Sequence, residues 1–174
     1  MGGIYNNNCN YLAKYDPYPK IRLAALKRLD SREYQETFSL IASREKNHEI
    51  QLEAIKMIRK PSLQEYQQMQ SHVYRNIENI AKWMIQASRE VRREALKKII
   101  NDEVLYDIAR EDTYEQFSLF ALGQIQDRKY IESLQNTSRH RSIRKKATNI
   151  IDPWKLSLIQ KIAKWIMDNF SKPR

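Results

Sequence analysis

The sequence predicts an all-α fold, an α-solenoid superhelix of about five helical hairpins with a C-terminal capping helix. The first observation behind this prediction is a nine-residue amphipathic pattern that recurs five times, its last three copies beginning 26 residues apart. That spacing accommodates two helices of roughly ten residues each and two short turns. The second is that the 174 residues include only 3 Gly, whereas the hairpins of a sheet-rich fold usually need Gly or Asn-Gly.

Each copy of the pattern has the spacing of a helix with one buried side. Its first position is apolar, its fifth is always Ala, and its ninth is Leu or Ile. At about 100° per residue these positions share one face, and a small residue at the centre of that face lets a second helix approach closely. One pair of helices cannot bury both of its faces, so neighbouring pairs must stack. The copies span residues 21–29, 50–58, 91–99, 117–125 and 143–151, with Ala25, Ala54, Ala95, Ala121 and Ala147 at position five.

Second amphipathic segments lie between the copies and complete the expected hairpins, over residues 34–43, 103–110 and 129–135. Pro17 and Pro19 precede the first copy, where the start of a helix tolerates proline. Four acidic residues that follow copies of the pattern are expected to cap the next helix: Asp30, Asp102, Asp127 and Asp152. Asp152 with Pro153 predicts the start of a separate final helix, from Trp154 to about Phe170.

A longer interval between the second and third copies indicates an insertion near residues 60–75. Pro61 ends the preceding helix, and Ser62 with Glu65 forms a capping-box pattern. Helical spacing then continues to about Ala87, which predicts either a longer outer helix or an additional one. The segment Ile80-Ala-Lys-Trp closely matches Ile162-Ala-Lys-Trp, which indicates a shared outer-helix role for the two.

Composition divides the chain into three stretches. Residues 1–15 are an Asn-rich N-terminal segment for which a flexible conformation is one interpretation, residues 16–151 hold the array, and residues 152–174 form a basic amphipathic helix and tail. The single Cys excludes a disulfide framework and favours a reducing compartment. No apolar run reaches the ~18 residues of a membrane helix, and the N-terminus lacks the apolar core of a secretory signal. We therefore expect a cytoplasmic protein.

The motifs in two stretches resemble those of a known family. Residues 117–127 (FSLFALGQIQD), with Ile131 and Leu134 after them, resemble HEAT repeats of the short, phycobilisome-lyase-like type, and so does 16–22 (DPYPKIR). The resemblance covers about residues 16–151 and implies a binding surface rather than an activity; no residue set suited to a bilin is evident. It also implies that an Arg at position two of the pattern bonds an Asp in a neighbouring turn. Arg22, Arg92 and Arg144 match this feature, while Gln51 and Ser118 depart from it.

No constellation of residues predicts catalysis, a cofactor or a metal site. The three histidines, His48, His72 and His140, are far apart in the chain, and none has the spacing of a zinc motif. Cys9 has no base near it in sequence that would activate a thiol. We therefore expect a protein that is not an enzyme.

A weaker resemblance keeps one enzymatic alternative open. DNA-alkylation-repair glycosylases are also built from HEAT-like pairs, with Trp, Tyr and Asp on a basic concave face, and this chain has Trp83, Trp154 and Trp165 with a basic end. Because Trp83 and Trp165 follow Ile-Ala pairs at helical spacing, packing is the preferred role for these two.

The positive charge is concentrated near the C-terminus. The chain has a formal net charge of +10, and residues 139–174 contain ten Lys and Arg residues against two acids. Such a basic end either binds phosphates or an acidic partner, or keeps the last repeat soluble. The candidate contacts there are Arg139, Arg141, Arg144, Lys145, Lys146, Lys161 and Lys164.

A second candidate surface follows from the helical pattern itself. In HEAT arrays the motif-bearing helices usually line the concave side, and positions 3, 4 and 7 of the pattern point away from the buried stripe. If these positions are exposed, they form a groove suited to an amphipathic helix or an acidic peptide; the alternative is that the leucines pack against the adjacent helix and the lysines are merely solvated. The residues are Leu23, Lys27, Leu52, Lys56, Arg93, Lys97, Leu119 and Phe120.

The sequence thus favours a scaffold or adaptor that binds a partner protein or peptide through a concave helical surface and the basic end. The alternative is nucleic-acid binding through the basic patch at residues 139–164, and more remotely a DNA-repair glycosylase. For the final helix, covering the last apolar face of the array is preferred over lying on a membrane surface.

Overall fold

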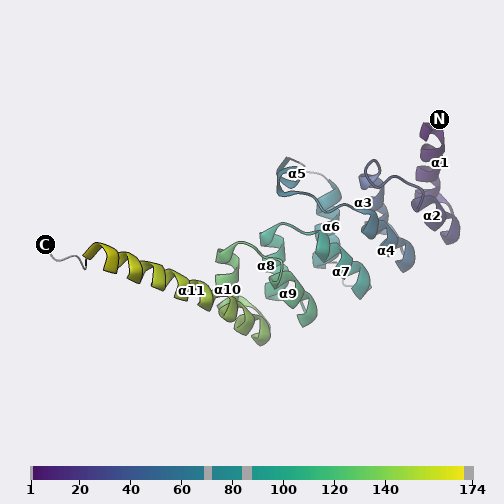
Figure 1. The fold of residues 1–174 in the computed structure, drawn as a ribbon. Coiled ribbons are helices and arrows are strands. Elements are labelled where there is room, and N and C mark those ends of the chain that lie inside the picture. Colours follow the sequence, from purple (N-terminus) through teal and green to yellow (C-terminus); the bar gives the residue numbers. More distant parts are fainter. Residues whose placement is uncertain (1, 69–71, 84–87, 171–174) are drawn as a thin grey trace. The chain divides into compact units, whose positions relative to one another are not determined.

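The described part of the chain is entirely helical. The computed structural model describes the backbone of residues 2–68, 72–83 and 88–170 and the side chains of 8–66, 72–82, 88–152 and 158–165, and none of these residues forms a strand (Figure 1). The chain divides into two compact units, residues 1–104 and 105–174, and each is described by itself.

The first unit consists of two layers of helices. In one layer α4 packs against both α2 and α7, and in the other α3 packs against both α1 and α6. The layers are joined as hairpins, because α1 packs on α2, α3 on α4 and α6 on α7 (Figure 1). The helices are α1 Gly2–Tyr15, α2 Pro19–Leu26, α3 Gln35–Arg44, α4 His48–Met57, α5 Leu63–Gln68, α6 His72–Trp83 and α7 Arg89–Lys98.

The second unit repeats the hairpin arrangement with four helices: α8 (Asp102–Glu111, which begins at the end of the first unit), α9 (Glu115–Leu122), α10 (Arg128–Thr137) and α11 (Arg141–Phe170). α11 packs against both α9 and α10. α8 lies beside α10, because the Tyr106 hydroxyl is 2.9 Å from that of Ser133 and its ring centroid is 5.2 Å from that of Tyr130.

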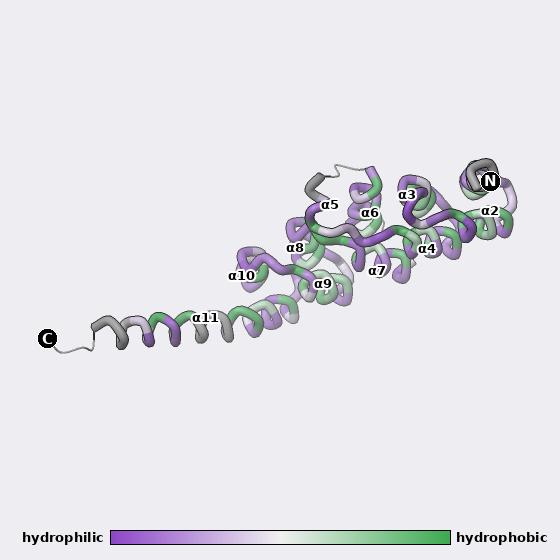
Figure 2. The backbone as a smooth tube through the Cα atoms, turned by 45° about the horizontal axis from the view of Figure 1, so that its top comes forward, coloured by the Kyte–Doolittle hydropathy of each residue, from purple (hydrophilic) through white to green (hydrophobic). Residues whose placement is uncertain are grey.

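The alanines of the repeated pattern are all buried, as the sequence predicts. The five copies lie in α2, α4, α7, α9 and α11, and their ninth positions are buried as well. Ile21 is the exception at position one, 43 % exposed, because α2 has a helix of the pattern on one side only. Figure 2 shows the green apolar segments of these helices alternating with hydrophilic ones. The buried alanines are Ala25, Ala54, Ala95, Ala121 and Ala147.

Position two of the pattern links three hairpins internally. The Gln51 amide donates to the Ala42 carbonyl at 2.8 Å, the Arg92 guanidinium to the Ala81 carbonyl at 2.9 Å, and the Ser118 hydroxyl to the Ile108 carbonyl at 3.2 Å. These acceptors lie in the last turns of α3, α6 and α8, where helix carbonyls have no partner within the helix. Gln51 and Ser118 depart from the family pattern, yet they form the same link.

Arg22 and Arg144 at position two donate to carbonyls of the preceding turn. The Arg22 guanidinium donates to the Asp16 carbonyl at 2.8 Å and that of Arg144 to the Ser138 carbonyl at 2.6 Å. Arg22 also forms a two-bond ion pair with Glu45, at 2.9 and 3.1 Å. Burial favours a higher pKa for Glu45, but the hydrogen bonds from Arg22 and from backbone N–H groups outweigh it and lower the pKa. The pair fastens the turn after α3 to α2.

The predicted caps are correct at Asp127 and wrong at Asp102. The Asp127 carboxylate accepts from the Lys129 N–H at 3.0 Å, whereas α8 is capped by the preceding Asn101, which accepts from the Glu103 N–H at 3.0 Å. Asparagine and aspartate cap equally well, so the local sequence did not separate these neighbours. Asp30 accepts from two N–H groups of the turn before α3, not at the first residue of that helix.

The insertion adds a helix. Ser62 and Glu65 form the predicted capping box, with the Glu65 carboxylate accepting from the Ser62 N–H at 2.8 Å and the Ser62 hydroxyl from the Glu65 N–H at 3.2 Å. The short helix α5 follows, and α6 begins separately at His72. The predicted continuation to Ala87 lies outside the described residues beyond Trp83.

Residues 2–15 form the helix α1, which the sequence did not predict. Ala13 is buried, and the Thr37 hydroxyl of α3 donates to the Asn10 side-chain oxygen at 2.8 Å. The segment contains too few apolar residues for helical periodicity to show. Its helix therefore depends on packing against α2 and α3.

The predicted break at Asp152-Pro153 is wrong, because α11 is one helix from Arg141 to Phe170. An interior proline removes one i→i−4 hydrogen bond and usually kinks or breaks a helix, so the sequence favoured a start at this point; α11 nevertheless continues through it. The C-terminal half does not cap the array: Leu158, Ile159 and Ile162 are 49–61 % exposed.

The shared role predicted for the two Ile-Ala-Lys-Trp segments is also wrong. In α6, Ile80 and Ala81 are buried, whereas in α11 Ile162 is exposed and Trp165 is 60 % exposed. The preferred packing role for Trp165 is therefore incorrect within the second unit. The side chains of Trp83 and Trp154 lie outside the described residues.

We predict that Ala54→Leu lowers the free energy of unfolding by about 1–3 kcal/mol, because extra methylene groups at a fully buried position force the facing helices apart. Urea unfolding followed by circular dichroism measures the loss. Ala24→Leu, at an exposed position of α2, is the matched control and should change stability by less than about 0.5 kcal/mol. Equal losses in both variants would contradict the buried alanine contact.

We predict that Gln51→Leu costs about 1–3 kcal/mol, because the buried Ala42 carbonyl loses its donor while the substituted side chain keeps a similar size. The same unfolding measurement applies, with Gln64→Leu on the exposed side of α5 as control. No difference between the two variants would show that the link does not stabilise the α3–α4 hairpin.

Candidate interaction surfaces

Three exposed lysines occupy equivalent positions on three neighbouring helices of the first unit. Lys27 lies at the end of α2, Lys56 in the last turn of α4 and Lys97 in the last turn of α7, and all three are exposed. Because α4 packs against both α2 and α7, the structure brings these predicted site residues together. We call Lys27, Lys56 and Lys97, with the exposed Arg93, the lysine face.

The leucines predicted for the same surface are partly covered. Leu23 and Leu52 are half-buried, so they contribute both to packing between the helices and to the surface. With exposed bases beside half-buried leucines, this surface is mainly charged and has only small apolar patches. It is less hydrophobic than the sequence predicted.

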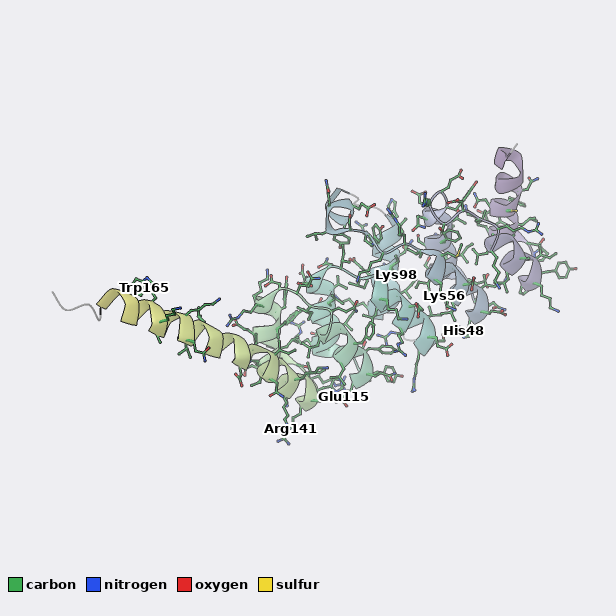
Figure 3. All side chains as sticks on the ribbon, in the orientation of Figure 1. His48, Lys56, Lys98, Glu115, Arg141 and Trp165 are labelled. Atoms are coloured by element: carbon green, nitrogen blue, oxygen red, sulfur yellow. The ribbon has the colours of Figure 1, made fainter. Side chains whose placement is uncertain are left out.

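Further bases enlarge the positive region at the ends of α4 and α7. The Lys98 ammonium donates to the Lys56 carbonyl at 3.5 Å, and Figure 3 shows both lysines on neighbouring helices. Burial is the main cause that lowers the pKa of Lys98; the charges of Lys97 and Lys60 add to it, and Glu94 opposes it. Glu94 also pairs with Lys97 at 2.5 Å. Neighbouring bases thus add to the effect of burial on Lys98 at this edge.

The position of these lysines also has a structural explanation. The C-terminal end of a helix carries a partial negative charge, and a cation there is stabilising by about 0.3–1 kcal/mol. Lys56 and Lys97 lie in such last turns. Part of the lysine face is thus accounted for by helix stability alone.

A cluster of bases around the beginning of α11 has no such explanation. Arg141 is exposed at the first residue of α11, whose first turn holds no acidic residue; Arg139 is exposed just before the helix, and Lys145 and Lys146 are exposed in its second turn. The beginning of a helix is its positive end, so a base in the first turn opposes the macrodipole. We call these four residues, with the half-buried Arg144, the basic turn; Figure 3 labels Arg141 on it.

The remaining predicted site residues lie elsewhere in the second unit. Leu119 and Phe120 are half-buried on α9, and Lys161 and Lys164 are exposed on the C-terminal half of α11. The lysine face belongs to the first unit and these residues to the second, so the structure groups the predicted residues into two sets.

An apolar stripe that the sequence assigned to a cap is exposed on α11. Leu158, Ile159, Ile162 and Trp165 are 49–61 % exposed, and the exposed Lys161 lies within the same two turns. We call the four apolar residues the α11 stripe. Figure 2 shows this part of α11 continuing beyond α9 and α10 within its unit.

Sequence reasoning missed a groove on the opposite layer of the first unit. It has a volume of about 820 Å³ and lies between α1, α3 and α6, where Thr37 bonds Asn10 and the Asn76 amide donates to the Ser39 hydroxyl at 3.3 Å. Its lining combines polar residues with apolar ones such as Leu40 and Val73 from separate segments of the chain, so no sequence motif indicates it. Its charges are mixed, with Lys14 and Arg32 beside Glu33 and Glu36, and they define no ligand class.

Within the described residues, the three histidines and the single cysteine do not lie together in a common site. His48 and His72 are exposed, and a His140 ring nitrogen lies 2.7 Å from the Asp112 carbonyl. Cys9 is a half-buried free thiol. Within the described ranges, no three His, Cys, Asp or Glu side chains are grouped closely enough to hold a metal ion, and none of the helices searched is both long and apolar enough to cross a membrane.

Comparison of this chain with protein-family models, with curated proteins and with solved structures gave no match. The features that bear on function are therefore the two sets of surface residues, the lysine face of the first unit and the predicted site residues of the second.

We predict opposite effects of charge reversal at the two basic regions. Arg141→Glu should raise stability by about 0.3–1 kcal/mol, since an acid favours the start of a helix, and Lys56→Glu should lower it by a similar amount. Thermal unfolding at low ionic strength measures both, and high salt should reduce both effects. A loss of stability in Arg141→Glu would contradict the view that the basic turn is unfavourable for the helix.

Proposed function

We propose that this chain is a HEAT-like helical-repeat protein, an α-solenoid superhelix in the cytoplasm, that acts as a non-enzymatic adaptor. It binds a partner protein of acidic character through the lysine face and the basic C-terminal end. The observation that carries the proposal is the alignment of Lys27, Lys56 and Lys97, all exposed, on helices that pack side by side. The buried pattern alanines and the two-layer hairpins support the HEAT-like class.

An acidic protein suits this surface better than an apolar peptide. Long-range attraction between the lysine face and acidic side chains accelerates association and selects the partner. The half-buried Leu23 and Leu52 leave small apolar contacts between the charges, and interfaces of moderate affinity combine both kinds of contact.

Nucleic-acid binding is a second candidate, and the basic turn favours it. Phosphates attract clustered Arg and Lys without sequence preference. Arg139, Arg141, Lys145 and Lys146 are all exposed, and Arg141 lies in the first turn of α11, where a base opposes the helix dipole. A charge arrangement that costs stability is more readily explained by a ligand than by solubility. The DNA-repair glycosylase gains no catalytic residue from the described side chains and is not pursued further.

The proposal predicts that a partner protein is lost when the lysine face is reversed. The tagged full chain is used to capture partners from its native host after nuclease treatment, and the captured protein should be missing with the triple variant Lys27→Glu, Lys56→Glu, Lys97→Glu. The matched control reverses three exposed bases of the other layer and of the turn before α3, Arg32, Arg44 and Arg75, and should retain the partner. Circular dichroism checks that each variant is folded.

Two outcomes would contradict the adaptor proposal. Equal capture by both triple variants would remove the lysine face from binding. Release of the bound material by nuclease, with loss of binding on charge reversal at Arg141 and Lys145, would assign the nucleic-acid function instead; its affinity would then fall steeply with salt, the slope decreasing by about one for each phosphate contact removed.

A further inference from the structure

We infer that the α11 stripe is the docking site for an acidic amphipathic helix of a partner protein. This deepens the proposed function, on which it rests, by naming a partner class for the C-terminal end. The stripe and the lysines beside it all belong to the second unit.

The stripe continues a face that is already an interface. At about 100° per residue, Leu158 and Ile162 lie on the same side of α11 as Ile143, Ala147 and Ile151, within an arc of about 100°. The earlier three side chains are fully buried, and α11 packs there against α9 and α10. Over its N-terminal half this face is covered by helices, and over the described residues 158–165 the same face is exposed.

That continuity determines the shape of the occupant. α9 and α10 stand on the covered half of the face, so the exposed half lies beside a step whose depth is one helix, about 10 Å with side chains. A second helix lying along α11 fits the step in the way that α10 fits the covered half. A flat bilayer does not, because α9 and α10 would meet it before the stripe did.

The internal sequence match gives a second reason for a helix. Ile80-Ala-Lys-Trp of α6 has the sequence of Ile162-Ala-Lys-Trp of α11, and in α6 its Ile and Ala are buried. α6 packs there against α3 and α7. The Ile-Ala pair of this segment thus packs between helices in α6, whereas in α11 no helix of the second unit covers Ile162 and Ala163.

Charge determines the chemistry of that helix. Lys161 and Lys164 are exposed on α11, and no acidic residue occurs in the sequence between Asp152 and Asp168. Acidic residues flanking an apolar stripe would pair with these lysines, as oppositely charged flanks do in helix pairs. A second copy of the chain would bring lysines against lysines, so self-association of the stripe is disfavoured.

The test uses two synthetic helical peptides of about three turns or more, with the same leucine stripe and with either Glu or Lys at the flanking positions. Binding of fluorescent peptide to the full chain is followed by anisotropy. The Glu peptide should bind and the Lys peptide should not. The double variant Lys161→Glu, Lys164→Glu should reverse this preference, which a purely hydrophobic stripe would not do.

Two single substitutions separate the stripe from the rest of α11. Ile162→Asp should weaken binding of the Glu peptide at least about tenfold, as expected for a central apolar contact. Gln160→Asp adds the same charge on the opposite, exposed side of the helix and should change affinity less than about twofold, apart from a small charge effect. Since both positions are exposed, unchanged thermal unfolding of each variant shows that the fold is retained.

Four results would overturn the inference: no binding of the Glu peptide, equal binding of both peptides, dimerisation of the full chain that Ile162→Asp abolishes, or stripe-dependent binding to phosphatidylserine vesicles without binding of the Glu peptide. Light scattering detects the dimer. The lysine face is intact in all these variants. If the stripe fails these tests while reversal of Lys27, Lys56 and Lys97 still abolishes capture of the partner, the inference about the stripe is wrong and the adaptor proposal is retained.

Discussion

Close approach of helices through buried alanines is the constraint on which the rest of this structure depends. Ala54 in α4, Ala95 in α7 and Ala121 in α9 have essentially no exposed surface. A small side chain at the centre of an apolar face lets the backbone of a neighbouring helix come near, and the larger residues on either side then interlock. Each hairpin presents such a face, so it gains stability mainly from its neighbours.

Close packing of the helices buries backbone carbonyls at helix ends, and side chains at position two of the pattern donate hydrogen bonds to them. A helix that ends inside a packed hairpin leaves its last carbonyls without partners, and burying them unpaired is costly. Gln51 and Arg92 each donate to such a carbonyl of the preceding helix. Ser118 donates to the Ile108 carbonyl, which also accepts from the Asp112 N–H at 3.1 Å. Side chains of three different types and lengths make one kind of link, because the requirement is a donor at that place rather than a particular residue.

Charge in this protein has two different physical origins. At the ends of α4 and α7, lysines stabilise the helices that carry them, so their presence alone says little about a ligand. At the beginning of α11 the exposed Arg141 opposes the helix dipole, and on its C-terminal half bases flank an exposed apolar stripe. Sites where a local rule is broken without a local gain are the ones where a binding role explains the sequence best.

The sequence by itself determined the helical class, the five buried alanines, the capping box at Ser62 and the cap at Asp127. These follow from spacing and from short-range hydrogen bonds, which are properties of neighbouring residues. It also nominated the lysines of α2, α4 and α7, since the pattern places them opposite the buried face. Their grouping on adjacent helices required the packing of the first unit.

Only the tertiary structure decided the features that depend on what lies against a segment. Ile80 and Ala81 are buried in α6, whereas the matching Ile162 and Ala163 are exposed in α11, because helices pack against that part of α6 and none of the second unit covers the described part of α11. The continuity of α11 through Pro153 and the existence of α1 are of the same kind. Local sequence fixes which residues can form a helix or an apolar face, whereas burial of that face is a property of its surroundings.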